Sequence, residues 1–172
     1  MKIFGITGWK NSGKTTLVVK LVETLTARGY RVSTLKHAHH HFDIDHQGTD
    51  SFRHREAGAQ EVLVASGKRW ALIHEVKSNP PEELPLQYFI DKMKPVDLLL
   101  IEGFKQEAFP KLMVVRPDHN AEPLPADVGN VVAIASDAGV STKVYGVEGP
   151  VLDLNNIEMV ADYVEAYCQL KF

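Results

Sequence analysis

The chain has 172 residues, of which 44% are hydrophobic and 24% are charged, and its formal net charge is −3. A chain of this length fits one domain, residues 1–172, and can bury a core without disulfides. The slightly negative charge offers no basic surface for nucleic acid or an anionic membrane, and no run of about 18 apolar residues could span a bilayer. We therefore expect neither a nucleic-acid nor a membrane partner.

The cysteine content and the first residues of the chain bear on its compartment. A single cysteine, Cys168, cannot form an internal disulfide, which suits the cytosol. Cys168 stands at helical spacing from Val160 and Val164, so we expect a core residue rather than a reactive thiol. No charged leader precedes the first apolar run at residues 3–6. These features predict a cytoplasmic protein.

The chain opens with a predicted strand, helix and second strand. An apolar run predicts a strand over residues 3–6, and leucines and valines at helical spacing predict a helix over residues 16–28 that ends at Gly29. Residues 30–36 predict the second strand. Because such a short strand–helix–strand unit implies a right-handed crossover, both strands belong to a parallel sheet.

The middle of the chain predicts a helix and a hairpin. After a polar stretch, a helix begins near Thr49 or Asp50 and ends at Ala57. Residues 61–65 and 69–76 predict two short antiparallel strands joined by a tight turn. If the chain pairs with a second copy, the exposed edge of this hairpin is the expected interface.

The later elements complete an α/β fold, in which a mostly parallel sheet carries helices on both faces beside the small antiparallel hairpin. The most apolar strand, residues 96–101, belongs at the centre of the sheet. The other predicted elements are a helix over residues 86–93, strands over residues 111–116, 131–135 and 144–147, and a final helix that Asn155 and Glu158 open as a capping box and that ends near Leu170.

Directly after the first strand the chain carries the phosphate-binding pattern G-x-x-x-x-G-K-[ST], which is typical of the P-loop NTPase fold. Its glycines let backbone N–H groups approach a phosphate, and the following helix points its positive end at the same place. We expect Lys14 to act as a catalytic group on the β- and γ-phosphates and Thr15 to ligate Mg²⁺. The expected nucleotide-binding residues of this loop are Gly8, Trp9, Lys10, Asn11, Ser12, Gly13, Lys14, Thr15 and Thr16.

A carboxylate follows the most apolar strand at Glu102. Ligands of an open parallel sheet bind beyond the carboxyl ends of its strands, so Glu102 shares an edge with the phosphate loop. There it can hold Mg²⁺ or orient an attacking water as a catalytic group, and the alternative is a solvated strand end. Asp97 lies at the opposite end of the strand, about 16 Å away, and is a poor metal candidate.

The second predicted strand leads into a segment rich in histidine and aspartate. Its position is that of a switch loop, which senses the γ-phosphate through Mg²⁺. Three interpretations stay open: a loop that contacts an anion or ligand, a transition-metal site, or a solvated polar loop. Asp43 or Asp45 could join a metal shell, and Asp45 is the preferred candidate metal ligand of this segment. The candidate switch residues are Lys36, His37, His39, His40, Asp43, Asp50 and Ser51.

Asp137 follows the strand predicted over residues 131–135. In P-loop GTPases an aspartate from this late strand binds the guanine base. The usual companion pair Asn-Lys is absent, because Ile134 and Ala135 stand in its place. Asp137 is therefore either a guanine-binding residue or the first residue of an Asx turn before Gly139.

Together these motifs resemble molybdopterin-guanine dinucleotide biosynthesis protein B, a family of P-loop GTP-binding proteins. The resemblance covers most of residues 3–137. Its specific parts are the pattern K-H-x-H-H from Lys36 and the pattern E-G-F-K from Glu102 to Lys105. The full set of matching segments is residues 8–16, 36–40, 43–45, 48–51, 55–59, 69–72 and 98–105.

The resemblance implies a cytoplasmic homodimer that binds GTP and Mg²⁺. It implies help in attaching GMP to molybdopterin, beside a separate molybdenum cofactor guanylyltransferase that performs the transfer. Residues 36–51 and 102–105, including Lys105, carry over as surfaces that face the nucleotide and the pterin or the partner enzyme. Hydrolysis is expected to be slow at best, because neither an arginine finger nor a water-positioning glutamine can be assigned.

Two other functions share parts of this pattern. A phosphotransferase acting on a small alcohol or acid would have the same phosphate loop and acidic strand end. A nickel or zinc chaperone GTPase would use the histidines of residues 37–46.

Overall fold

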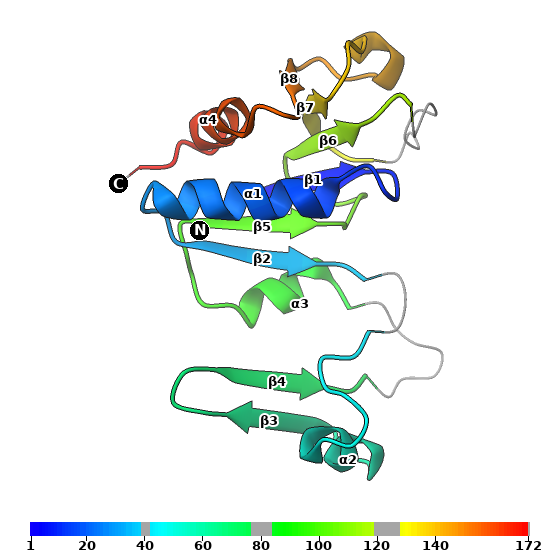
Figure 1. Cartoon of the computed structure of the whole chain (residues 1–172), viewed down its shortest axis with the longest axis vertical. Helices are drawn as coiled ribbons and strands as arrows, with labels where there is room; N and C mark the ends of the chain where they lie inside the picture. Colours follow the sequence, from blue (N-terminus) through cyan, green and yellow to red (C-terminus); the bar gives the residue numbers. More distant parts are fainter. Residues whose placement is uncertain (39–41, 77–83, 119–127, 172) are drawn as a thin grey trace. The chain divides into compact units, whose positions relative to one another are not determined.

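Six strands form one parallel sheet in the order β2-β5-β1-β6-β7-β8 (Figure 1). The computed structural model describes residues 1–38, 42–76, 84–118 and 128–171, and these divide into two compact units. The sheet belongs to the first unit, Met1–His37 with Lys94–Phe172, and the second unit is Ala38–Met93. The strands are β1 (Lys2–Gly8), β2 (Val32–Lys36), β5 (Leu98–Glu102), β6 (Lys111–Val115), β7 (Val131–Ser136) and β8 (Val151–Asp153).

Successive side chains of a strand point to opposite faces of this sheet, and a buried core forms on each face. Phe4, Ile6 and their neighbours face the helices α1 (Lys14–Ala27) and α4 (Ile157–Cys168), which pack on one another and cover one side. Strand residues that point to the other face, such as Met113 and Ile134, form a second buried cluster. The predicted central strand β5 is indeed interior, because residues 98–101 are fully buried between β1 and β2.

The strand predicted over residues 144–147 is wrong. Residues Thr142–Tyr145 form a 3₁₀ turn, η1, which ends at Gly146 with φ 65°. Val144 is exposed, while Tyr145 and Val147 pack on the second cluster. The side chains alternate as in a strand, but the N–H groups of Val144 and Gly146 donate to the carbonyls of Ser141 and Lys143, three residues earlier, and this bonding forms a turn. The last strand of the sheet is β8 instead.

The N-cap of the final helix α4 lies one residue later than predicted. The side chain of Asn156, not Asn155, accepts a hydrogen bond from the Met159 N–H at 3.1 Å. The Asn155 N–H donates to the Asp153 carboxylate, which shapes the turn before the helix. Glu158 pairs with Arg28 at the end of α1 rather than closing a capping box.

Cys168 lies in the core as predicted, on the buried face of α4. Burial raises the pKa of its thiol to about 11, so the reactive thiolate form is disfavoured.

Lys111 is a fully buried charged residue at the start of β6. Its Nζ donates to the carbonyl oxygens of Phe109 at 3.1 Å and Gly129 at 3.0 Å, and also to that of Glu107. The ammonium lies 4.0 Å from the centroid of the Phe109 ring. One side chain thus joins the segment that leads into β6 to the segment that leads into β7.

We expect Lys111→Met to lower the free energy of unfolding by about 2 kcal/mol at pH 7, because three carbonyls lose their donor. Burial lowers the pKa of Lys111 to about 8, against an ordinary value of 10.5, while Glu107 opposes the shift. Between these values the unfolded chain binds more protons, so this group makes stability rise with pH. The stability advantage of the wild type over the variant should therefore grow from pH 8 to 10.5. Urea unfolding across this range, with Lys143→Met on exposed η1 as control, measures both effects.

The second unit contains the predicted hairpin. Strands β3 (Glu61–Ala65) and β4 (Trp70–His74) pair antiparallel, and helix α2 (Asp50–Glu56) begins with Thr49 as its N-cap. Helix α3 (Leu86–Asp91) also belongs to this unit. Leu63 and Trp70 are exposed by 60% and 62%. An apolar surface on the hairpin fits the predicted homodimer interface, which stays a prediction.

Among the described residues, no helix is both long and apolar enough to cross a bilayer.

Candidate functional site

The loop between β1 and α1 needs backbone conformations that most residues avoid. Gly8, Asn11 and Gly13 have φ values of 141°, 63° and 96°. A Cβ at position 8 would lie 2.5 Å from the carbonyl oxygen of Val114 on β6, so only glycine fits there. The sequence pattern therefore encodes the turn that brings the loop back over the strand end.

Helix α1 begins directly at this loop without a capping side chain. Its N-cap is Gly13, and its first turn contains no acidic residue. The first N–H groups of a helix have no partner within the helix, and they carry the positive end of its dipole. Ser12 is fully buried, and its Oγ has no hydrogen-bond partner among the described residues. The start of α1 is thus a backbone site for an anion such as phosphate.

Lys14 lies at the mouth of the loop. Its Nζ donates to the carbonyl oxygen of Trp9 at 2.5 Å. Burial lowers the pKa of Lys14, the Glu102 carboxylate raises it, and the cations of Lys105 and Lys36 lower it further. The Lys105 Nζ lies 5.5 Å from the centroid of the Trp9 ring. Three lysines therefore surround one carboxylate here, which makes a positive site for a polyphosphate.

Glu102 meets Thr15 at the carboxyl end of β5, as the sequence predicts. The Thr15 Oγ1 donates to the two carboxylate oxygens of Glu102 at 2.9 and 3.1 Å. Lys36 lies opposite Glu102 in the β2–β5 register, with its Nζ 3.5 Å from Glu102 Oε1. A hydroxyl beside a carboxylate fits Mg²⁺, which takes few protein oxygens and keeps several waters. The described residues contain no group of three or more acidic, histidine or cysteine side chains placed to hold a metal.

Gly103 explains why the patterns K-H and E-G-F occur together. It has φ 106°, and a Cβ there would lie 2.7 Å from the Cβ of His37. The His37 N–H donates to the Glu102 carbonyl at 2.9 Å, and its ring stacks on Phe104 with centroids 4.5 Å apart. The ends of β2 and β5 are therefore locked together, and this fixes the backbone that carries Glu102.

We expect Gly103→Ala to lower the free energy of unfolding by about 1–3 kcal/mol, since it combines a positive φ with a steric clash. Gly139→Ala is the matched control, because nothing lies within 4 Å of its added Cβ and its φ is unstrained. Chemical denaturation of both variants provides the comparison. Equal stabilities would contradict the role given to the glycine.

Asp137 lies just beyond β7, where its carboxylate is 3.5 Å from the Nε of Arg116. Arg116 also packs on the phosphate loop, because a Cβ on Gly13 would lie 3.4 Å from its guanidinium nitrogens. The sequence analysis gave Arg116 no role. Its position directly after the carboxyl end of β6 could have indicated one, because ligands bind at that edge of the sheet. The arginine connects the proposed guanine contact with the phosphate loop.

The family described as molybdopterin guanine dinucleotide synthesis protein B matches residues 3–137 of the chain. The chain belongs to this family. A molybdopterin-guanine dinucleotide biosynthesis adapter protein of Escherichia coli is 40% identical over 171 residues, which is 97% of this chain and 93% of the relative. One of Haemophilus influenzae is 39% identical, over 95% of this chain and 87% of the relative.

A solved member of the family shares the fold. The crystal structure of Bacillus subtilis MobB matches with a TM-score of 0.73 and 26% identity, and the match covers 99% of each chain. The parallel sheet with its small antiparallel pair is therefore the fold of this family, as the sequence predicts.

In the chain described here, the candidate residues of the histidine-rich segment divide between the two units. Lys36 and His37 lie at the phosphate loop, whereas residues 43–51 belong to the second unit. Asp45, the candidate metal ligand, is buried and accepts a hydrogen bond from Arg55 at 2.9 Å. His39 and His40 lie outside the described residues, so their roles stay predictions. Of the other candidates, Asp43 pairs with Arg55, Asp50 lies 3.9 Å from Arg53, and the Ser51 hydroxyl lies 3.3 Å from that of Thr49.

Proposed function

We propose that the chain binds GTP with Mg²⁺ at the β1–α1 loop and acts as an accessory protein in attaching GMP to molybdopterin. The observation that carries this proposal is the uncapped start of α1 beside the Thr15–Glu102 pair. A backbone anion site and an oxygen pair for Mg²⁺ at one sheet edge are what a nucleoside triphosphate requires. The adapter names of the two bacterial relatives support the pathway.

Each residue of the site has a defined role in this proposal. The N–H groups of the loop and of the first turn of α1 bind the phosphates, and Lys14 moves from the Trp9 carbonyl to the β- and γ-phosphates. Thr15 and Glu102 hold Mg²⁺, directly or through water, and the ion supplies charge neutralisation on the phosphate oxygens. Lys36 adds positive charge beside them.

Hydrolysis is at most slow in this proposal, since the sequence assigns neither a water-positioning glutamine nor an arginine finger. Asp137 is the proposed guanine contact, and Arg116 orients its carboxylate. We further propose a cytoplasmic homodimer that works with molybdopterin and a guanylyltransferase. Membership of the family favours this function over a phosphotransferase or a nickel or zinc chaperone.

Calorimetric titration of GTP and ATP, each with and without Mg²⁺, tests the proposal. We expect GTP to bind more tightly than ATP and Mg²⁺ to strengthen both. A second titration, with the guanylyltransferase loaded with molybdopterin, tests the accessory role, and GTP affinity should rise when the partner is present. Failure to bind either nucleotide would remove the proposal, and a preference for ATP would remove the guanine contact.

A further inference from the structure

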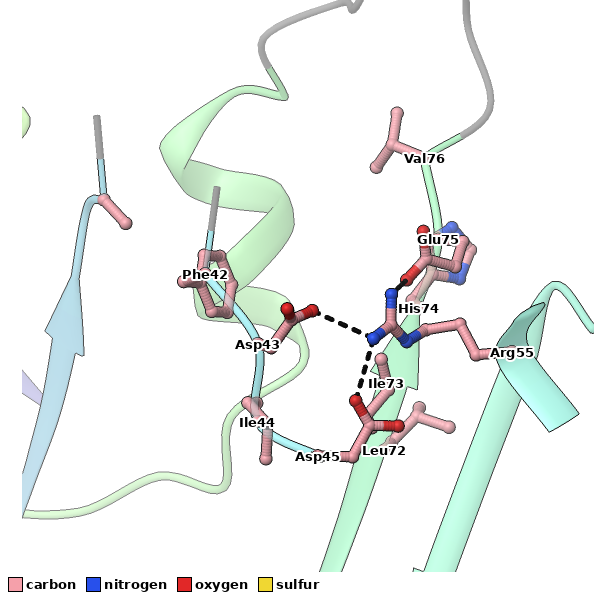
Figure 2. A pocket seen from close by; sticks show the side chains of 11 residues that line it. Phe42, Asp43, Ile44, Asp45, Arg55, Leu72, Ile73, His74, Glu75 and Val76 are labelled. Carbon is pink, nitrogen blue, oxygen red and sulfur yellow. Dashed lines mark hydrogen bonds and ion pairs between the residues drawn. The ribbon is translucent and has the colours of Figure 1, made fainter. Parts of the chain in front are cut away.

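The second unit contains a pocket of about 660 Å³ that the nucleotide site does not use. Residues 42–45 form one wall and residues 72–76, from β4 onward, form the other (Figure 2). The side chain of Arg55 reaches from α2 toward the carboxylates of both walls (Figure 2). All of these residues belong to one compact unit, so the pocket is complete within it.

The charge of this pocket is negative. The Arg55 Nη2 lies 2.9 Å from the carboxylates of both Asp43 and Asp45. Its Nη1 lies 3.6 Å from Glu75. Three carboxylates thus share one guanidinium, which leaves an excess of two negative charges. Such a pocket repels phosphate and accepts hydrogen bonds from N–H groups of a ligand.

The hydrogen bonding around Arg55 is incomplete. The side chain of Asp45 is only 6% exposed, yet its Oδ2 has no hydrogen-bond partner among the described residues. The Arg55 Nε is buried and also lacks a hydrogen-bond partner among them. Buried polar atoms are nearly always paired, so one acceptor and one donor here remain to be satisfied. The accessible carboxylates of Asp43 and Glu75, 61% and 38% exposed, flank this position.

The walls of the pocket are apolar beside these carboxylates. Phe42 is 71% exposed, and Ile44 and Val76 are 60% and 46% exposed. An aromatic ring next to aliphatic side chains suits a flat ring, which stacks with little loss of entropy. The combination of a stacking surface and hydrogen-bond acceptors selects a planar heterocycle rich in N–H groups.

We propose that this pocket binds the pterin ring of the molybdopterin substrate, through the 2-amino-4-oxopyrimidine edge. The proposal rests on the proposed function, in which molybdopterin is the molecule that receives GMP. The ring stacks on Phe42, and its ring N–H and 2-amino group donate to the carboxylates of Asp43 and Glu75. The phosphate-bearing side of the substrate points out of the negative pocket. Guanine has the same edge, so the experiment must distinguish a pterin ligand from a guanine ligand.

Fluorescence titration of the full chain with neopterin, a stable pterin, tests this assignment. We expect saturable binding to the wild type and a loss of about tenfold or more in affinity for Asp43→Asn and for Phe42→Leu. Glu56→Gln is the matched control, because Glu56 is exposed at the end of α2 and does not line the pocket. Lumazine, which carries an oxo group in place of the 2-amino group of unsubstituted pterin, should bind at least about tenfold more weakly than that pterin.

Guanosine provides the remaining arm of the titration. Guanosine binding as tight as that of neopterin would overturn the pterin assignment, as would equal binding of lumazine and unsubstituted pterin or unchanged affinity in both pocket variants. Absence of neopterin binding while GTP still binds would overturn the pocket alone and leave the proposed function standing. All variants should bind GTP like the wild type, and circular dichroism should show an unchanged fold. In the Asp43→Asn variant, Arg55 keeps its ion pairs with Asp45 and Glu75.

Discussion

Lys14→Ala should lower the affinity for GTP by about a hundredfold or more while leaving the fold intact. The ammonium lies at the loop, where it is half-buried and donates to the Trp9 carbonyl, and phosphate contacts with a lysine are strong when they are partly desolvated. A hundredfold loss corresponds to about 2.7 kcal/mol of binding free energy. Titration with a fluorescent GTP analogue measures the affinity, and far-UV circular dichroism measures the fold.

The fold should tolerate this change because Lys14 makes one hydrogen bond among the described residues, to the Trp9 carbonyl, and is not part of the buried core. Lys20→Ala, an exposed lysine on the same helix, is the matched control and should bind GTP like the wild type. It separates loss of the loop ammonium from a general loss of positive charge. Undiminished affinity in Lys14→Ala would place the nucleotide elsewhere.

The phosphate loop and the parallel sheet could be predicted because both rest on local signals. Gly8 and Gly13 occupy positions where φ is positive, so the pattern itself encodes the turn. The apolar run before Glu102 identified the central strand, and the rule that ligands bind at carboxyl ends then placed Glu102 beside the loop. In these cases a short segment determines both its structure and its neighbours.

Features that depend on distant segments could not be predicted in this way. Lys111 is buried because carbonyls from residues 107, 109 and 129 converge on it, and the sequence alone suggests an exposed lysine. Arg116 gains its role only when the ends of β6 and β7 lie beside the loop. The contacts of Lys111 with residue 129 and of Arg116 with Gly13 join segments that only the fold brings together, and no local pattern records them.

The aspartates after β2 show a different limit. Their position after a strand end suggested a switch loop at the nucleotide, and Asp45 was predicted to bind the metal. In the structure the Asp45 Oδ1 is bound to Arg55 in the second unit. A buried carboxylate that is already paired with a guanidinium is a poor partner for an additional cation. The metal role of Asp45 therefore stays a prediction.

Glu102→Gln should remove most of the strengthening that Mg²⁺ gives to GTP binding. The carboxylate is only 12% exposed and lies 3.5 Å from Lys36, with the Thr15 hydroxyl between them in hydrogen-bond contact with both. An amide keeps the hydrogen bond from Thr15 but loses the charge that holds Mg²⁺. We expect the Mg²⁺-dependent gain in affinity to fall by about tenfold or more, which is about 1.4 kcal/mol.

The binding measured without Mg²⁺ distinguishes a metal role from a structural one. With the metal chelated, Glu102→Gln should bind GTP at least as tightly as the wild type, because a negative charge next to the triphosphate has been removed. A variant that merely damaged the loop would lose affinity under both conditions. Glu23→Gln, an exposed glutamate on α1, is the control and should keep the full effect of Mg²⁺. An unchanged Mg²⁺ effect in Glu102→Gln would leave Thr15 and the nucleotide as the ligands and exclude Glu102.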